Sequence, residues 1–189
     1  MEFRKLIKSI TDRVNAKSYT GLLYGGLPKS IKQWDGSNLL TALDISLYAN
    51  RAIQKRADKV SEIEFVLHNA KGDEIKNDPL IDLLYRPNEL FTGRQFWSLW
   101  STYYDTVGET YIYLERDLTS ASGRAGKIKA LHHLIPTKVK PEFGDDGKVR
   151  VYKYNTAQKE IDYQPEDILY IHNPDPLQPL RGRSLLRAG

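Results

Sequence analysis

The proline-containing signals between residues 78 and 88 constrain the fold of this chain more than any other feature of its sequence. Asp78-Pro79 predicts the start of a helix, because Asp is a preferred N-cap and a proline at the first helical position needs no N–H donor. The helix is expected to continue through Leu84. Arg86-Pro87-Asn88 then predicts its end, since the residue before a proline is driven out of the α conformation.

A second helix follows at once. Thr92 can cap a helix from Gly93 to about Val107, and Gly108 suits the left-handed position at its end. The apolar stripe that would face a core consists of Phe96, Leu99, Trp100 and Tyr103. The aromatic-rich segment Thr110 to Arg116 is then expected to form a strand, so this block predicts two helices that lead into a strand.

Upstream of this block, the sequence predicts one long helix and one strand. Ser37 or Asn38 can cap a helix from Leu39 to Val60. Its apolar stripe contains Ile45, Tyr48, Ala49, Ala52, Ile53, Ala57 and Val60. Apolar and polar residues then alternate from Glu62 to His68, as in a half-buried strand.

The chain after residue 126 is predicted to be mostly β. Asp145-Asp146-Gly147 is a hairpin turn, because Asp-Gly tolerates positive φ angles. The segment from Asn173 to Pro179 is expected to be an irregular loop, and Ser184 resembles an N-cap before Leu185. The expected strands are Lys127–Leu134, Lys138–Phe143, Val149–Tyr154, Glu160–Tyr163 and Ile168–His172. The fold class is therefore predicted to be α+β, with two main helices and one shorter helix packed on a mostly antiparallel sheet.

Length and composition exclude several classes of protein. The 189 residues suit one domain, or a large domain plus an arm, and 40% of them are hydrophobic. No apolar run is long enough to span a membrane, and no leader peptide is recognised at the start. The absence of cysteine excludes disulfide bonds, thiolate metal sites and thiol catalysis.

Positive charge is concentrated in the N-terminal third, where residues 1–59 hold eleven Lys and Arg against five Asp and Glu. Phe3 to Val14 shows helical spacing, and the Gly-rich stretch that follows is expected to be extended, so residues 1–37 are predicted to be a basic helix and flexible arm before a domain at 38–189. A solvated helix face explains most such segments, and a phosphate-contacting arm is the alternative. The candidate contacts with DNA or with an acidic scaffold or capsid surface are Arg4, Lys5, Lys8 and Arg13.

No catalytic constellation, cofactor site or metal site is found in the sequence, and the chain is not expected to be an enzyme. The adjacent residues His132 and His133 would point to opposite faces of a strand and could not grip one metal ion together. Glu109 and Glu115 are six residues apart and could share a strand face, but an even spacing alone does not make a catalytic pair. His172 with Asp175 is the remaining candidate, and it is more typical of structure than of hydrolysis.

The aromatic residues of the Gly93–Val107 helix allow two interpretations. Trp100 and Tyr103 lie on the apolar stripe and are expected to pack in a core or a subunit interface. Trp97 lies off that stripe, which makes it the better candidate for an exposed contact with a base or a partner.

The segment DPLIDLLYRPNELFTGRQFWSLWSTYYDTVGETYIYLERD resembles the portal proteins of long-tailed double-stranded DNA phages and related prophages. Further stretches resemble the family in the same order: LHHLIPTKVKPEF, IDYQPEDILYIHN and LRGRSLL. His132-His133 departs from the family, which more often has an aromatic residue and proline there. The matching positions, for which the resemblance implies structural roles, are Asp78, Pro79, Arg86, Pro87, Asn88, Gly93, Gly108, Gly182 and Ser184.

This resemblance implies a structural subunit of the head-tail connector, a virion component that assembles in the host cytoplasm. Such subunits form a dodecameric ring at one capsid vertex, through which double-stranded DNA passes during packaging and ejection. The implied partners are sister subunits, capsid or scaffold protein, terminase and head-completion proteins, without a membrane. The resemblance covers the wing-like region and stops before the stem helix, so this chain is expected to be a wing portion, truncated before the stem and mostly monomeric alone.

A stand-alone nucleic-acid-binding module that uses the basic arm and Trp97 is the competing hypothesis. A binder of this kind loses affinity for DNA steeply as salt increases, by a log–log slope of ~0.9 per phosphate neutralised. Salt dependence therefore separates the two hypotheses.

Overall fold

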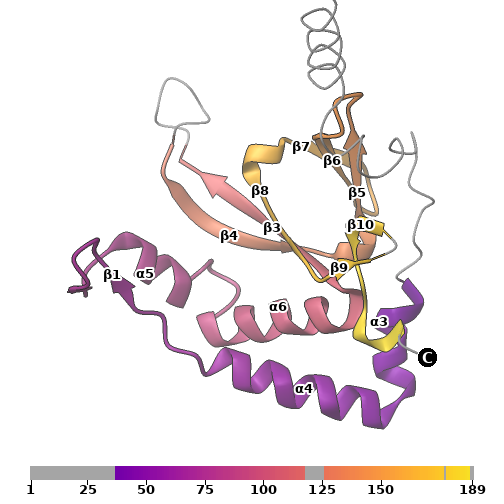
Figure 1. The fold of residues 1–189 in the computed structure, drawn as a ribbon, viewed down its shortest axis with the longest axis horizontal. Coiled ribbons are helices and arrows are strands. Elements are labelled where there is room, and N and C mark those ends of the chain that lie inside the picture. Colours follow the sequence, from indigo (N-terminus) through magenta and orange to yellow (C-terminus); the bar gives the residue numbers. More distant parts are fainter. Residues whose placement is uncertain (1–36, 118–125, 177, 188–189) are drawn as a thin grey trace, which may run out of the picture. The chain divides into compact units, whose positions relative to one another are not determined.

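The computed structural model describes residues 37–117, 126–176 and 178–187 (Figure 1). The predicted helix from Phe3 to Val14 and the arm that follows it lie outside the described residues. Among the helices that are described, none is long and apolar enough to cross a membrane. The described residues fall into two compact units: residues 140–165 form one, and the flanking residues form the other, larger unit.

The single helix predicted from Leu39 to Val60 is two helices, α3 (Ser37–Ile45) and α4 (Leu47–Ser61). Ser46 interrupts it with extended backbone angles, φ −106° and ψ 104°. Its hydroxyl accepts a hydrogen bond from the backbone N–H of Ala49 at 3.3 Å. The prediction was wrong here because serine can satisfy a helix N-terminus with its own side chain, and the apolar spacing on either side does not reveal such a break.

Helices α5 (Pro79–Tyr85) and α6 (Gly93–Val107) confirm the predicted block. Asp78 caps α5 by accepting a hydrogen bond from Leu80 N. Thr92 and Gln95 form a reciprocal capping box at the start of α6. Gly108 ends α6 with φ 88°, in the left-handed region that glycine adopts without strain.

Helix α6 lies along a three-stranded antiparallel sheet whose strand order is β4–β3–β8 (Figure 1). These strands are β3 (Glu109–Arg116), β4 (Ile128–Leu134) and β8 (Ile168–His172). Phe96 of α6, Ile112 of β3 and Leu131 of β4 form a buried cluster. Half-buried side chains packed around it are Leu83, Phe91, Trp97, Trp100, Leu114 and Ile128. The core of the larger unit is thus the contact between one helix and one sheet.

Helix α4 packs along α6 and buries Ile53 and Ala57 in the contact. The same contact contains an ion pair, in which Arg56 Nε lies 3.2 Å from Asp105 Oδ2. The Asp105 side chain is buried, and this burial raises the pKa of its carboxyl group, against the opposing effect of the Arg56 charge. Apolar packing and a partly desolvated charge pair therefore hold the two helices together.

The predicted strand from Glu62 to His68 is wrong for most of its length. Only β1 (Leu67–His68) is a strand, in a hairpin with β2 (Glu74–Ile75). Ile63 is 58% exposed, so the alternating pattern does not correspond to a buried face. A second short hairpin, β9 (Pro174–Asp175) with β10 (Gln178–Gly182), occupies part of the region predicted to be an irregular loop.

The smaller unit contains the sheet β5–β6–β7, formed by β5 (Val139–Phe143), β6 (Val149–Asn155) and β7 (Glu160–Tyr163). Gly147 has φ 77° in the predicted hairpin turn between β5 and β6. Lys153 lies 3.2 Å from Glu142 and 3.3 Å from Glu160, and hydrogen bonds to these two carboxylates raise its pKa. Three short 3-10 helices complete the described chain, η1 (Pro136–Lys138), η2 (Pro165–Asp167) and η3 (Leu185–Arg187). The α+β class is confirmed, although the β structure consists of several small sheets.

The two neighbouring histidines lie on opposite faces of β4, as predicted. His132 contacts Glu115 on the outer face, with 2.7 Å between Nε2 and Oε2. His133 faces α6, where its ring stacks on Phe96 and its Nε2 donates a hydrogen bond to the Phe96 carbonyl oxygen at 3.0 Å. Burial lowers the pKa of His133 to about 4, against the weaker opposing effect of that hydrogen bond.

We predict that His133 makes the fold sensitive to acid. Because its pKa is about 4 in the folded chain and near 6.5 when unfolded, its contribution is present above pH 6.5 and lost as the pH falls toward 4. Chemical denaturation of the wild type and of His133→Gln at pH 7 and pH 5 measures this contribution. The wild type should lose about 1–2 kcal/mol more unfolding free energy than the variant over this interval. Equal losses in the two proteins would contradict a buried neutral imidazole.

Candidate functional site

The connection between α5 and α6 is hydrogen-bonded to the free edge of β4. The carbonyl oxygen of Pro87 accepts a hydrogen bond from Leu131 N at 2.7 Å, and the side-chain amide of Asn88 donates one to Leu131 O at 2.6 Å. Asn88 Oδ1 also accepts from Leu90 N and Phe91 N. These two residues therefore take the place of a neighbouring strand at the edge of the sheet.

The N-terminus of α6 packs tightly on the end of α5. A Cβ atom at Gly93 would lie 2.7 Å from the carbonyl oxygen of Tyr85 and 2.9 Å from that of Leu84. Both obstacles are backbone atoms, so a larger residue would force the helices apart. The geometry explains why a glycine follows the capping threonine.

A second attachment lies at the other end of α6, where residues 173–176 and 178–184 pass over the turn between α6 and β3. We call these residues the strap. Asn173 N donates to Gly108 O at 2.8 Å, and Arg183 N donates to Asn173 O at 2.8 Å. The Asn173 side chain donates a further hydrogen bond to Arg183 O. Backbone groups at the turn and in the strap thereby satisfy one another.

Two glycines allow this close approach. A Cβ atom on Gly108 would lie 2.3 Å from the carbonyl carbon of Arg183, and one on Gly182 would lie 2.1 Å from the oxygen of Gly108. Neither contact is sterically possible with a side chain. The strap can therefore reach the turn only because both positions lack a side chain.

The centre of this junction is the fully buried carboxylate of Glu109, which follows the turn directly. Its Oε1 lies 2.7 Å from Arg181 Nη2, and its Oε2 accepts a hydrogen bond from Gly182 N at 3.1 Å. The Tyr170 hydroxyl lies 3.1 Å from the same Oε2. Burial, and to a lesser extent the Glu109 charge, raises the pKa of Tyr170, which keeps its hydroxyl protonated as a donor.

Ser184 ends the strap. Its hydroxyl donates to the carbonyl oxygen of Thr106 in α6 and accepts a hydrogen bond from Leu186 N at 2.9 Å. The residue thus anchors η3 to the last turn of α6 and caps its start, as its sequence context predicted. The Glu109 carboxylate at the centre of the junction is buried and has all its printed partners within this chain, an arrangement suited to holding segments together.

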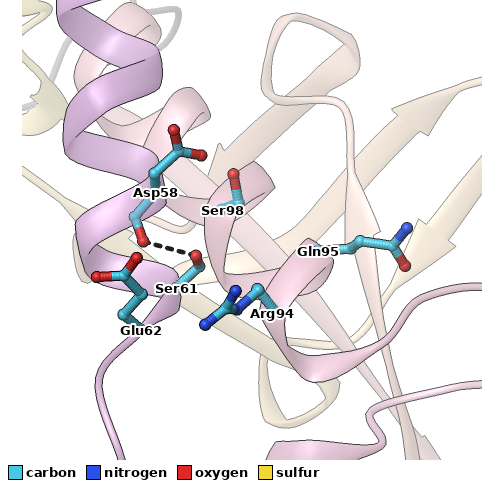
Figure 2. Close-up of a pocket in the computed structure, with 6 residues that line it drawn as sticks. All are labelled: Asp58, Ser61, Glu62, Arg94, Gln95 and Ser98. Atoms are coloured by element: carbon cyan, nitrogen blue, oxygen red, sulfur yellow. Dashed lines mark hydrogen bonds between the residues drawn. The ribbon is translucent and has the colours of Figure 1, made fainter.

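A small polar pocket of about 310 Å³ lies between the end of α4 and the start of α6 (Figure 2). Its lining residues are Asp58, Ser61, Glu62, Arg94, Gln95 and Ser98. The Ser61 hydroxyl donates to Asp58 O at 2.7 Å, and Glu62 forms an ion pair with Lys59 at 2.8 Å. The lining contains both signs of charge, and no cluster of metal-ligating residues is found among the described residues. We assign no ligand to this pocket.

Trp97 does not lie as the sequence indicated. Its ring is half-buried among other aromatic residues, 5.1 Å from the ring of Phe65 and 5.2 Å from that of Phe96. Its indole N–H donates to Leu84 O at 2.9 Å. These contacts join α6 to α5 and to the segment before β1. Trp97 is less exposed than its position on the helix indicated, because a residue just off the apolar stripe can still be covered by a neighbouring loop. Contact with DNA or a partner stays a prediction for this residue.

The two candidate carboxylates are separated by the fold. Glu109 and Glu115 have different partners, since Glu115 pairs with His132 on the exposed part of the sheet and lies 3.8 Å from Lys129. His172 stacks on Tyr170 in β8, and Asp175 is buried in β9. Arg4, Lys5, Lys8 and Arg13 lie outside the described residues. The sequence reasoning missed the pairing of Glu109 with Arg181, for which the signal was a charged residue placed between a helix-ending glycine and a buried strand.

We predict that Glu109 and Arg181 are energetically coupled. Glu109→Ala leaves a buried guanidinium and the Gly182 N–H unpaired, and Arg181→Ala leaves a buried carboxylate, so each should lower the unfolding free energy by about 3–5 kcal/mol. The double variant should lose at least ~1 kcal/mol less than the sum of the single variants. Urea denaturation measures these values, and hydrogen exchange of the strap should increase in each single variant.

The matched control is Lys153→Ala, which removes ion pairs of similar length that are partly exposed to solvent. Its effect on the unfolding free energy should be much smaller than that of either single variant at the junction, because solvent screens exposed ion pairs. Additive losses for Glu109 and Arg181 would show that the strap is not held by this pair.

Comparison with known structures finds a similar fold in chains of gene transfer agent (GTA) particles. A chain in the structure described as the neck of an empty GTA particle computed with C6 symmetry aligns with a TM-score of 0.72 and 18% identity, over 84% of this chain and 42% of that one. A chain in the virion of a native gene transfer agent (GTA) particle aligns with a TM-score of 0.67 and 18% identity, over 88% and 44%. The neck of a native GTA particle computed with C12 symmetry gives 0.63 and 17%, over 82% and 39%. The chain thus spans about two fifths of the length of the structures it matches.

At these identities the structural alignments establish the fold alone. Among curated proteins, none matches this chain. The sequence model of the phage portal protein family matches residues 48–189, which include all but the first residue of α4, and also α5, α6, the sheet beside them and the strap. Proteins of this family are structural and not enzymes. The chain therefore belongs to the phage portal protein family.

Proposed function

We propose that this chain is the wing portion of a portal subunit, one of the ring of subunits at the vertex where a virus-like head meets its tail. The family match over residues 48–189 is the observation that carries the proposal. The fold shared with chains of the GTA neck supports it. Residues 38–189 would form the wing-like region, with residues 1–37 as a basic helix and flexible arm.

The buried hydrogen bonds of the larger unit are consistent with a structural role in a particle. Buried polar attachments lie at both ends of α6: Asn88 on the edge of β4 at one end and Glu109 under the strap at the other. Such attachments resist displacement, because removing one partner leaves a buried polar group unsatisfied. A wing in a ring needs this rigidity to keep a constant angle to its neighbours.

The finer roles follow from the family. The ring would be dodecameric, serve head assembly and give double-stranded DNA its passage during packaging and ejection, in the virion and earlier in the host cytoplasm. Sister subunits and capsid or scaffold protein would contact the wing. Terminase and head-completion proteins would bind portal regions that this chain does not include.

The location in the particle is the direct test. An antibody raised against the 189-residue chain, applied to particles purified from the source organism, should label one site per particle, at the head–tail junction. Immunogold electron microscopy measures the label, and pre-immune serum is the control. Labelling spread over the whole head, or none on particles opened to expose the neck, would contradict the proposal.

The competing function, a stand-alone nucleic-acid-binding module, is favoured only by the basic N-terminal third. We predict weak, non-saturating binding of duplex DNA, measured by fluorescence anisotropy from 50 to 300 mM salt. A stand-alone binder would instead saturate, with affinity falling by a log–log slope of ~0.9 for each phosphate neutralised. Saturable, steeply salt-dependent binding would favour the module over the portal wing.

A further inference from the structure

We propose that residues 62–90, which form one end of the larger unit, are the docking surface for the N-terminal segment 1–36 of a neighbouring copy of this chain. The inference rests on the proposed ring and names the contact between successive subunits. We call residues 62–90 the α5 end. It includes β1, β2 and α5.

The α5 end leaves large apolar side chains exposed. Of the nine large hydrophobic residues that are exposed in the described part of the chain, five lie between residues 63 and 90. They are Ile63, Val66, Leu80, Tyr85 and Leu90, and Leu90 is 80% exposed. Concentrated apolar exposure of this kind is typical of an interaction surface rather than of a free monomer surface.

Contacts within the α5 end connect these side chains. The Tyr85 hydroxyl accepts a hydrogen bond from Phe65 N at 3.1 Å, and the two rings meet edge to face at 6.1 Å. This holds the segment that contains Ile63 and Val66 against the C-terminal turn of α5. Leu90 follows two residues after Asn88, whose side chain fixes the backbone there by accepting from Leu90 N. The apolar residues are therefore presented by a backbone that is held in place.

The same end is acidic. Residues 62–90 contain seven Asp and Glu against three Lys and Arg. Glu74, Asp82 and Glu89 are all exposed. The surface thus combines apolar side chains with net negative charge, so a partner should be both apolar and basic.

The N-terminal segment has this complementary composition. Residues 1–36 contain seven Lys and Arg against three Asp and Glu, so their net charge equals that of the α5 end with the opposite sign. Apolar residues recur at helical spacing in the same segment, namely Phe3, Leu6, Ile7, Ile10 and Val14. An amphipathic basic segment can cover an exposed apolar surface and neutralise the carboxylates around it.

The proposed ring favours a contact between successive copies. The segment joins the larger unit at α3, whereas the α5 end lies beyond the opposite end of α4, a helix of 15 residues and therefore about 22 Å long (Figure 1). An attachment point at one end of a subunit and an acceptor surface at the other suit a head-to-tail interface, the kind of interface by which subunits form rings.

Charge reversal on each side tests the contact in the full 189-residue chain. Glu74→Lys/Asp82→Lys/Glu89→Lys should weaken self-association roughly tenfold, and Arg4→Glu/Lys8→Glu/Arg13→Glu should do the same. Combining the two sets should restore association to within about threefold of wild type. Sedimentation velocity at 50 mM salt and high protein concentration measures the dissociation constants, since exposed charges are screened at higher salt.

The matched control reverses the same number of exposed carboxylates elsewhere, in Asp145→Lys/Asp162→Lys/Glu166→Lys. It should leave the dissociation constant unchanged, and circular dichroism should show all variants folded. Absence of restoration in the combined variant would overturn the inference. If the arm binds DNA instead, reversal at the α5 end would leave self-association unchanged and would strengthen DNA binding, which would also overturn it.

Cross-linking identifies the occupant directly. A photoreactive phenylalanine derivative at position 10, in an equal mixture of ¹⁴N and ¹⁵N chains, should cross-link to residues 62–90 in mixed-isotope pairs. Cross-links confined to single-isotope pairs would show the segment bound to its own chain, and cross-links elsewhere would show another site. Either result overturns the inference while the vertex labelling still tests the portal proposal separately.

Discussion

The buried carboxylate of Glu109 is the interaction on which the larger unit depends, because it joins three segments that are far apart in sequence. It follows the turn from α6 into β3, contacts Tyr170 of β8 and binds the strap through Arg181 and Gly182. A buried charge is costly unless it is paired and hydrogen-bonded, so its stability depends on partners from all three segments. The same requirement makes Gly108 and Gly182 necessary, because only their missing side chains allow the strap close enough.

At the opposite end of α6, uncharged groups hold the neighbouring segments together. Pro87 and Asn88 cover the hydrogen-bonding edge of β4, and Gly93 lets α5 lie against the start of α6. Helix α6 is therefore fixed at both ends by close backbone approaches and fixed between them by the apolar contact of Phe96 with Ile112 and Leu131. The family-matching positions in this part of the chain are those where backbones approach closely or are capped, which is consistent with a structural protein.

Sequence reasoning succeeded where a signal is local. The cap at Asp78, the left-handed Gly108 and the opposite faces of His132 and His133 each depend on a few adjacent residues. It failed where the structure of a segment depends on residues that are distant in the sequence or on competing local signals. The break at Ser46 competes with continuous helical spacing, and the alternation from Glu62 to His68 has no sheet to join beyond two residues. The partner of Glu109 is more than seventy residues away, and no spacing rule connects it with Arg181.

The two ends of the larger unit differ in whether their side chains find partners within the chain. At the strap, the buried Glu109 carboxylate finds its partners within the same chain, in Arg181, Gly182 and Tyr170. At the α5 end, apolar side chains remain exposed although the backbone that carries them is fixed by Phe65, Tyr85 and Asn88. Apolar side chains gain nothing from exposure to water, and the hydrogen bonds at Phe65 and Leu90 hold the backbone that carries them. Their burial therefore requires another segment, and the basic amphipathic sequence before α3 is the part of this chain whose charge and apolar spacing match this surface.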